Sequence, residues 1–242
     1  MQLAGLHHVT CVCSDAQQTL EFYRDTLGFT LVKKTVNLDD PHSYHLYFGD
    51  SSASAGSLIT FFEWPRADQG RLGRGTLESL GIETPAVATE SELRDPDGLR
   101  LVLHPGEQPR LHDVVALGNA DLYFGLVSDD APLRFSGPVD EPALIGPGTT
   151  HHIAWRAADA DELERWLERL AGLGLRPTAM QDRKYFRSIY FRMPDGLLME
   201  IATDGPGFMV DEPPDELGHH LSLPMWLEPE RETLERELAP IG

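Results

Sequence analysis

The stretch His7-His8-Val9-Thr10-Cys11-Val12-Cys13-Ser14-Asp15-Ala16 recurs 144 residues later as His151-His152-Ile153-Ala154-Trp155-Arg156-Ala157-Ala158-Asp159-Ala160. The His-His pair, the Asp and the final Ala are identical in the two copies, and Val9 is matched by Ile153. Each copy is typical of a strand that runs into a helix, with Asp15 and Asp159 near the N-cap position. The sequence therefore predicts two copies of one structural unit.

The segments after each copy extend this unit. Apolar residues at helical spacing follow both copies, and glycines are expected to end the helices at Gly28 and in the 172–174 stretch. Strand-like segments come next, at 30–36, 43–48 and 58–64 in the first copy, and at 177–180, 187–192 and 197–203 in the second. Each copy thus predicts a βαβββ unit. One such unit leaves a curved sheet with an uncovered face, so we expect the two units to pair and enclose a cup.

The middle of the chain is less regular. It offers strand candidates at 75–84, 99–104 and 121–127 but no amphipathic helix as long as the other two, so we interpret it as reduced modules that have lost their helices. The expected class is α+β, with paired βαβββ modules that form a metal cup. The expected organisation is a first module at 1–65, reduced middle modules at 66–147, a last module at 148–210, and a C-terminal acidic segment at 211–242 that packs on the body, with a short helix over 230–238.

The composition limits the partners. The chain has 242 residues, 41% of them hydrophobic, and a net charge of −19, which fits a soluble globular protein and disfavours nucleic acid and anionic membranes. No apolar run reaches the roughly 18 residues of a membrane span. The two cysteines, Cys11 and Cys13, are expected to be buried strand residues, with a zinc half-site as the alternative. Without an apparent signal peptide, we expect a cytoplasmic protein.

The two His-His pairs are candidate metal ligands because they occupy equivalent places in two units. Adjacent side chains on a strand point to opposite faces, so one histidine of each pair is expected in the cup, with the other behind the sheet or supporting the site indirectly. Glu200 lies in an otherwise apolar strand, where an unpaired charge is costly, and is the expected third ligand. The alternative is a Glu200 paired with Arg183 or Arg192.

Two histidines and one carboxylate with open positions form the facial triad of non-haem Fe(II) oxygenases. The corresponding strand of the first unit, around Phe61, is apolar and offers no obvious ligand. We therefore expect one mononuclear site that spans both units.

Five stretches together resemble a known family. They are 6–10 (LHHVT), 148–154 (GTTHHIA), 182–192 (DRKYFRSIYFR), 198–208 (LMEIATDGPGF) and 223–229 (LPMWLEP). The chain resembles the vicinal oxygen chelate superfamily of glyoxalases, bleomycin resistance proteins and extradiol dioxygenases. More narrowly, it looks like the bacterial ring-cleaving dioxygenases of the hydroquinone 1,2-dioxygenase type.

The resemblance implies a function and a set of site residues. The implied metal ligands are His8, His152 and Glu200, and the implied cofactor is Fe(II), with Mn(II) as an alternative. The implied reaction is extradiol-type cleavage of a small aromatic substrate by dioxygen. The positions that match the family's substrate contacts and ligand supports are His7, Thr10, His151, Arg183 and Tyr190.

The chain also departs from the family pattern, because members usually have four βαβββ units and a longer middle. Substrate preference and subunit contacts, including a homo-oligomer, are therefore open expectations. One competing interpretation is a glyoxalase-like isomerase or lyase, which often uses zinc or nickel and a ligand set richer in carboxylate. The other is a binding protein of the bleomycin-resistance kind that uses the cup without metal.

Overall fold

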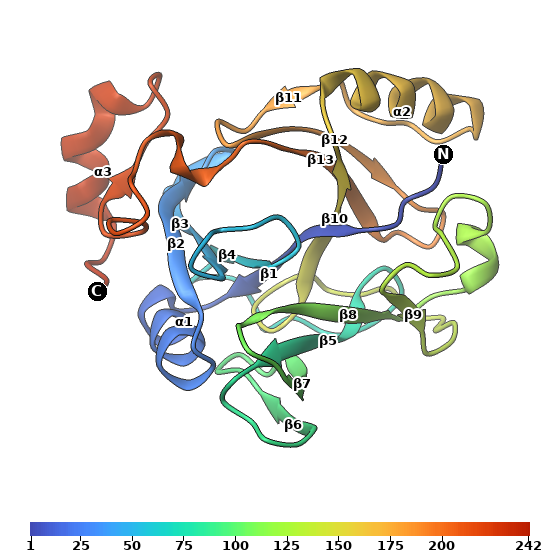
Figure 1. The fold of residues 1–242 in the computed structure, drawn as a ribbon, viewed down its shortest axis with the longest axis horizontal. Coiled ribbons are helices and arrows are strands. Elements are labelled where there is room, and N and C mark those ends of the chain that lie inside the picture. The colour runs from blue at the N-terminus through green and yellow to red at the C-terminus, as the bar shows by residue number, and fades with distance from the viewer.

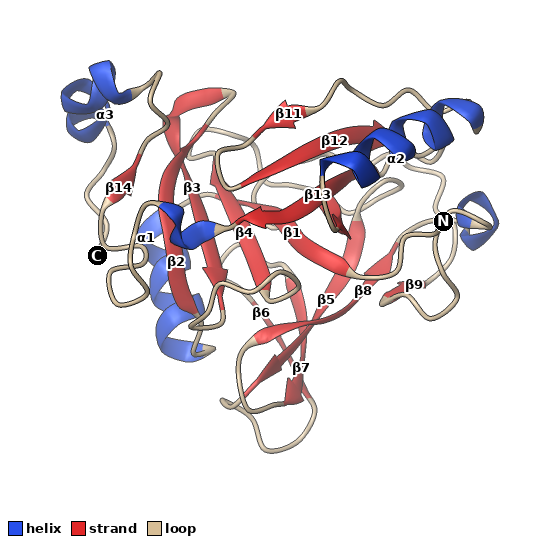
Figure 2. Cartoon of the chain, turned by 45° about the horizontal axis from the view of Figure 1, so that its top comes forward, coloured by secondary structure: helices blue, strands red, loops and turns tan.

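The computed structural model of the protein describes all 242 residues and contains two β-sheets of unequal size (Figure 1). The larger sheet consists of β1 (Leu6–Cys13), β2 (Thr30–Asn37), β3 (Asp40–Gly49), β4 (Leu58–Glu63), β10 (Thr150–Ala157), β11 (Gln181–Asp182), β12 (Phe186–Arg192), β13 (Leu198–Pro206) and β14 (Leu221–Ser222). Their order is β11-β12-β13-β10-β1-β4-β3-β2-β14. The strands form the centre of the molecule and the helices lie at its edges (Figure 2).

The two copies of the repeat lie side by side in the middle of this sheet. β1 pairs antiparallel with β10, and each has the last strand of its own unit as a parallel neighbour on the other side, β4 for β1 and β13 for β10. The predicted α+β fold with two paired βαβββ units is therefore confirmed. The proposed limits at 65, 147 and 210 fall between strands, and the division into modules stays a prediction.

The helices begin where the sequence predicts. The helical segments are α1 (Ala16–Glu21), a π-helical turn that continues it (Phe22–Thr26), α2 (Ala160–Gly172), α3 (Arg231–Glu237), and 3-10 turns at Ala120–Tyr123, Phe208–Val210 and Glu228–Glu230. The carboxylates of Asp15 and Asp159 each accept a hydrogen bond from a backbone N–H three residues later, as N-caps do. Gly28 follows the first helix in the left-handed conformation that glycine adopts without strain, with φ of +79°.

The middle of the chain folds into the smaller sheet, below β1 in Figure 1. This sheet consists of β5 (Leu77–Thr84), β6 (Ser91–Arg94), β7 (Arg100–Pro105), β8 (Arg110–Ala116) and β9 (Leu133–Phe135). The order of its strands is β6-β7-β5-β8-β9. As predicted, the middle of the chain contains no α-helix. The strand predicted at 121–127 is wrong. A 3-10 turn forms there because Asn119 caps it and the Tyr123 hydroxyl donates to the buried Asp195 carboxylate at 2.9 Å.

One difference concerns a segment near the cup. The short strand predicted at 177–180 is wrong, because the paired strand β11 begins only at Gln181. Thr178 instead forms hydrogen bonds with the Tyr190 backbone through its own N–H and its hydroxyl.

At the C-terminus, the predicted helix is confirmed as α3, which packs beside β3 with Leu234 fully buried. No helix is long and apolar enough to span a membrane.

The smaller sheet is joined to the first repeat unit through Asp95, a buried carboxylate that receives hydrogen bonds from two backbone N–H groups and from the Tyr23 hydroxyl. Burial raises the pKa of Asp95 to about 6. An unfolded aspartate has a pKa of about 3.9, so folding favours the protonated form. The stability that this group contributes is complete below about pH 4 and is lost as the pH rises through 6.

We therefore expect Asp95→Asn to stabilise the protein at pH 8 and to have little effect at pH 4. A shift of about two pKa units limits the gain to roughly 3 kcal/mol, and the loss of any carboxylate-specific hydrogen bond reduces it. Urea unfolding of both proteins between pH 4 and pH 8 measures the difference. The two proteins carry the same other acidic groups, so any difference in the pH dependence of their unfolding free energies comes from Asp95. If the two unfolding free energies change in parallel with pH, the raised pKa of Asp95 is contradicted.

Candidate metal centre

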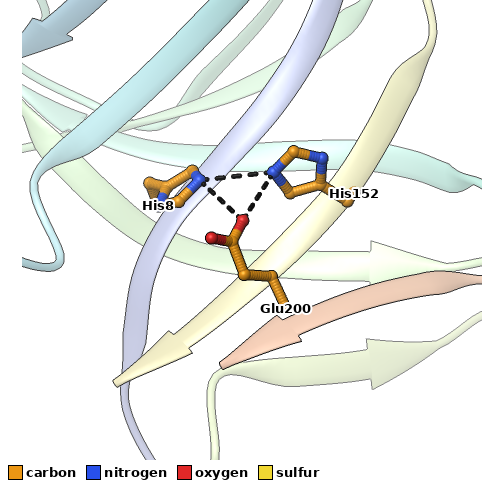
Figure 3. Close-up of side chains that lie close together, drawn as sticks. All are labelled: His8, His152 and Glu200. Atoms are coloured by element: carbon orange, nitrogen blue, oxygen red, sulfur yellow. Dashed lines mark hydrogen bonds and ion pairs between the residues drawn. The ribbon is translucent and has the colours of Figure 1, made fainter. Parts of the chain in front are cut away.

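His8, His152 and Glu200 converge at the centre of the large sheet, on the neighbouring strands β1, β10 and β13. His8 Nε2 and His152 Nε2 lie 3.3 Å and 2.9 Å from the same oxygen, Glu200 Oε2, and 3.3 Å from each other. All three side chains are buried, and Figure 3 shows the two imidazoles and the carboxylate pointing toward one another. The structure thus brings together the three residues predicted as ligands.

The first histidine of each pair orients the second. His7 Nδ1 lies 2.9 Å from His8 Nδ1, and His151 Nδ1 lies 2.8 Å from His152 Nδ1. Burial, aided by the adjacent His8 or His152, lowers the pKa of both His7 and His151 to about 3, so each is neutral and its Nδ1 can accept a hydrogen bond. With the proton on Nδ1 of His8 and His152, their Nε2 lone pairs face the centre, as in metal sites where the other ring nitrogen is held by a partner.

The expectation that only one histidine of each pair enters the cup is wrong for the second pair. His151 and His152 both line the cavity, whereas in the first pair only His8 does and His7 packs behind it on Phe186. The cause is a pair of β-bulges between β1 and β10. The pairing shifts between Leu6 and His8 and again between Thr10 and Cys11, which leaves His7 and His151 as the extra residues. A bulge re-aims a side chain and interrupts strict alternation.

The donor atoms fit a cation. Neither oxygen of Glu200 has a hydrogen-bond donor of suitable geometry, although Oε2 lies close to both imidazoles, and the residue is fully buried. Burial alone would raise the pKa of Glu200, but the adjacent histidines hold it well below its ordinary value. The alternative arginine partners are engaged elsewhere: Arg183 donates to Tyr190 Oη, and Arg192 to the Gly196 carbonyl. Two imidazole nitrogens and one carboxylate oxygen suit a non-haem iron.

The three donors open onto a cavity of about 360 Å³, within the range of small-molecule sites. Its wall combines aromatic rings with polar side chains. The lining residues include Asn37, His45, Tyr47, Phe62, Trp64, Gln181, Arg183, Lys184, Tyr185, Phe186, Tyr190 and Pro224. The chemistry of this wall suits a flat aromatic ligand.

Arg183 and Tyr190 lie together in this wall. Arg183 Nε donates to Tyr190 Oη at 3.1 Å, its guanidinium lies 5.0 Å from the tyrosine ring centroid, and the Tyr190 ring is 5.7 Å from that of His152. Burial and the nearby Glu200 raise the pKa of Tyr190 well above its ordinary value, so its hydroxyl stays protonated. The Tyr190 hydroxyl can therefore donate a hydrogen bond to a ligand oxygen near the metal donors. The Arg183 guanidinium places positive charge beside that oxygen.

Thr10 lies further from the cavity than the sequence suggests. It is fully buried, does not line the cavity, and contacts Thr60 through the two hydroxyl oxygens at 2.8 Å. His45, which is not among the residues predicted from the sequence, does line the cavity and hydrogen-bonds to the same Thr60 hydroxyl. Its only sequence signal is a histidine within the predicted apolar strand 43–48.

Comparison with known proteins gives consistent matches over the whole chain. The family model described as Glyoxalase/Bleomycin resistance protein/Dioxygenase superfamily matches residues 5–201. MhqA of Bacillus subtilis, provisionally named a ring-cleaving dioxygenase, is 30% identical over 100% of both chains. The chlorohydroquinone/hydroquinone 1,2-dioxygenase of Sphingobium indicum is 28% identical over 98% of this chain and 96% of its own.

The fold is shared with a solved structure. The crystal structure of a provisionally named dioxygenase from Bacillus subtilis has a TM-score of 0.89 and 31% identity, covering 100% of this chain and 98% of that chain. The alignment with MhqA extends over 321 positions, whereas this chain has 242 residues. The chain is therefore shorter than a relative that it matches from end to end.

Proposed function

The chain belongs to the Glyoxalase/Bleomycin resistance protein/Dioxygenase superfamily, and we propose that it is an Fe(II)-dependent, extradiol-type ring-cleaving dioxygenase that acts on a hydroquinone or a related small phenol. The observation that carries the proposal is the His8, His152 and Glu200 donor set, which opens onto an aromatic-lined cavity. The names of the relatives at about 30% identity support the dioxygenase class.

In this proposal the bound iron supplies Lewis acidity and adjacent binding positions for a phenolic oxygen and dioxygen. His8, His152 and Glu200 hold it, and His7 and His151 fix the orientation of the two imidazoles. The protonated Tyr190 hydroxyl donates to oxygen atoms of the bound reactants, and the Arg183 charge stabilises negative charge that develops there. The surrounding aromatic rings position the substrate ring and exclude water.

The two alternatives are less well supported. A glyoxalase-like isomerase of this superfamily is expected to carry more carboxylate ligands, and a purely ligand-binding protein has no need for three buried donors in contact. A binding protein without metal does not account for the pair of hydrogen bonds that aim both Nε2 atoms at Glu200.

The test is to purify the protein anaerobically, load it with Fe(II), and follow oxygen uptake with a panel of hydroquinones and catechols. We expect one dioxygen consumed per hydroquinone, with loss of the aromatic absorbance and incorporation of both atoms of labelled dioxygen into the product. Oxygen-independent isomerisation of a thiol–aldehyde adduct by the zinc- or nickel-loaded protein, without oxygen uptake on any phenol, would contradict the proposal.

A further inference from the structure

His45 is a buried histidine in the cavity wall that has no place in the ligand set. It lies in the middle of β3, is 8% exposed, and borders the same cavity as the metal donors. Its ring packs against Tyr47 and Phe62, with centroid distances of 4.0 Å and 4.4 Å. Two aromatic neighbours therefore fix the plane of the imidazole.

One nitrogen of this ring is held by the protein and the other is not. His45 Nε2 lies 2.9 Å from the Thr60 hydroxyl, which in turn lies 2.8 Å from the Thr10 hydroxyl. No group of the chain hydrogen-bonds to Nδ1. Burial, with the nearby His8 and His152, lowers the pKa of His45 well below its ordinary value, so the ring is neutral. Nδ1 is then an acceptor or a donor, depending on which way the threonine hydroxyls point.

His45 and the ligand His152 share a neighbour in the cavity wall. The Phe62 ring centroid lies 4.4 Å from that of His45 and 6.4 Å from that of His152. A substrate ring that packs on Phe62 with one oxygen at the metal donors therefore has His45 as a further neighbour in the same cavity. Among dihydroxybenzenes, the para isomer places its second oxygen furthest from the first.

Three other polar groups of the wall are held by the protein. Lys184 Nζ contacts Asp211 at 2.5 Å and the Leu223 carbonyl at 2.9 Å. Arg183 is bound to Tyr190, and the Asn37 side-chain oxygen accepts from the Asp39 backbone N–H. His45 differs from these groups, because its imidazole is preorganised by Thr60 and keeps one ring nitrogen that no group of the chain hydrogen-bonds.

We propose that His45 Nδ1 hydrogen-bonds to the second hydroxyl of a para-dihydroxy aromatic substrate, with Thr60 as the positioning residue that orients its imidazole. The proposal rests on the proposed function and names the substrate class of the same site. A phenolic hydroxyl can donate or accept, so it satisfies Nδ1 in either tautomer. A methyl group in its place leaves a buried polar atom unpaired, which costs binding free energy.

The test is anaerobic calorimetry of the Fe(II)-loaded protein with hydroquinone and with 4-methylphenol, which has a similar shape but lacks the second hydroxyl. We expect wild-type protein to bind hydroquinone about tenfold more tightly, the value of one buried hydrogen bond of about 1.4 kcal/mol. His45→Phe keeps an aromatic ring between Tyr47 and Phe62 and is expected to bind the two ligands about equally. His45→Gln, which keeps a hydrogen-bonding group, should recover part of the preference.

Thr60→Val tests the positioning role. It should reduce the preference for hydroquinone while iron content and binding of 4-methylphenol stay at the wild-type level, a pattern that a general loss of structure does not produce. Equal binding of the two ligands by wild-type protein, or an unchanged preference in folded His45→Phe, would overturn the proposal. Absence of oxygen uptake would instead count against the proposed function, since ligand binding is measured without oxygen.

Discussion

Replacement of Glu200 by glutamine is expected to remove iron binding and ring cleavage together. Glutamine has nearly the same shape but no charge, and Glu200 is the only carboxylate among the three buried donors. Loss of a group that merely supports a ligand costs roughly 10- to 100-fold in metal affinity or activity, so loss of the anionic ligand should cost more than 100-fold. Metal analysis after anaerobic loading and oxygen uptake with hydroquinone measure the two effects.

Thermal unfolding separates this loss from misfolding. Added Fe(II) should raise the melting temperature of wild-type protein, because a metal that binds only the folded state stabilises it, but should not raise that of Glu200→Gln. The matched control is Glu63→Gln, on β4 of the same sheet, whose carboxylate accepts from the Ala16 backbone N–H and does not line the metal cavity. This control should keep its iron and activity. Glu200→Gln protein with wild-type iron content would contradict the ligand assignment.

The sequence predicts the central part of this site because the repeat supplies it twice. Two identical His-His pairs with one carboxylate in an apolar strand are visible without a structure. The orientation of His151 into the cavity is not, because it depends on bulges set by the register between strands 144 residues apart. His45 has no histidine counterpart in the second unit, where the strand pairing places Ser188, and a lone histidine in a strand carries no functional signal.

In the fold, too, the parts that local residues determine are predictable from the sequence, whereas the parts that depend on tertiary contacts are not. Apart from the short segment 177–180, the capped helices and the strands of both repeat units are predicted correctly, because local residues determine them. The apolar run at 121–127 fits a strand equally well, and only tertiary contacts decide against it: the Tyr123 hydroxyl reaches Asp195, 72 residues away. Three strands of the small sheet escape prediction: β6 and β9 are short and lie at its edges, and β8 carries arginine, histidine and aspartate among its apolar residues.

Replacement of Lys33 by methionine is expected to destabilise the protein strongly, because this lysine, unlike most, is buried. The Lys33 side chain is fully buried on β2 and forms ion pairs with Asp211 and with Glu212, which is itself 7% exposed. Asp211 keeps a second cation, Lys184, but removal of Lys33 leaves the Glu212 carboxylate buried without one. Breaking one half of a buried pair costs about 3–5 kcal/mol, which corresponds to a fall in melting temperature of roughly 10 °C for a chain of this size.

The double variant Lys33→Met/Glu212→Gln distinguishes this mechanism from lost packing, because it removes both charges and should regain most of the stability. Lys34→Met is the matched single exchange: its ammonium is half-buried, contacts only the Ile241 carbonyl at 3.4 Å, and should change the melting temperature little. If the double variant is no more stable than Lys33→Met, an unpaired Glu212 is not the cause. If the double variant regains stability, the buried Glu212 carboxylate without its cation is what destabilises Lys33→Met. The ion pair between Lys33 and Glu212 then both holds the start of the C-terminal segment on β2 and makes its attachment depend on one lysine.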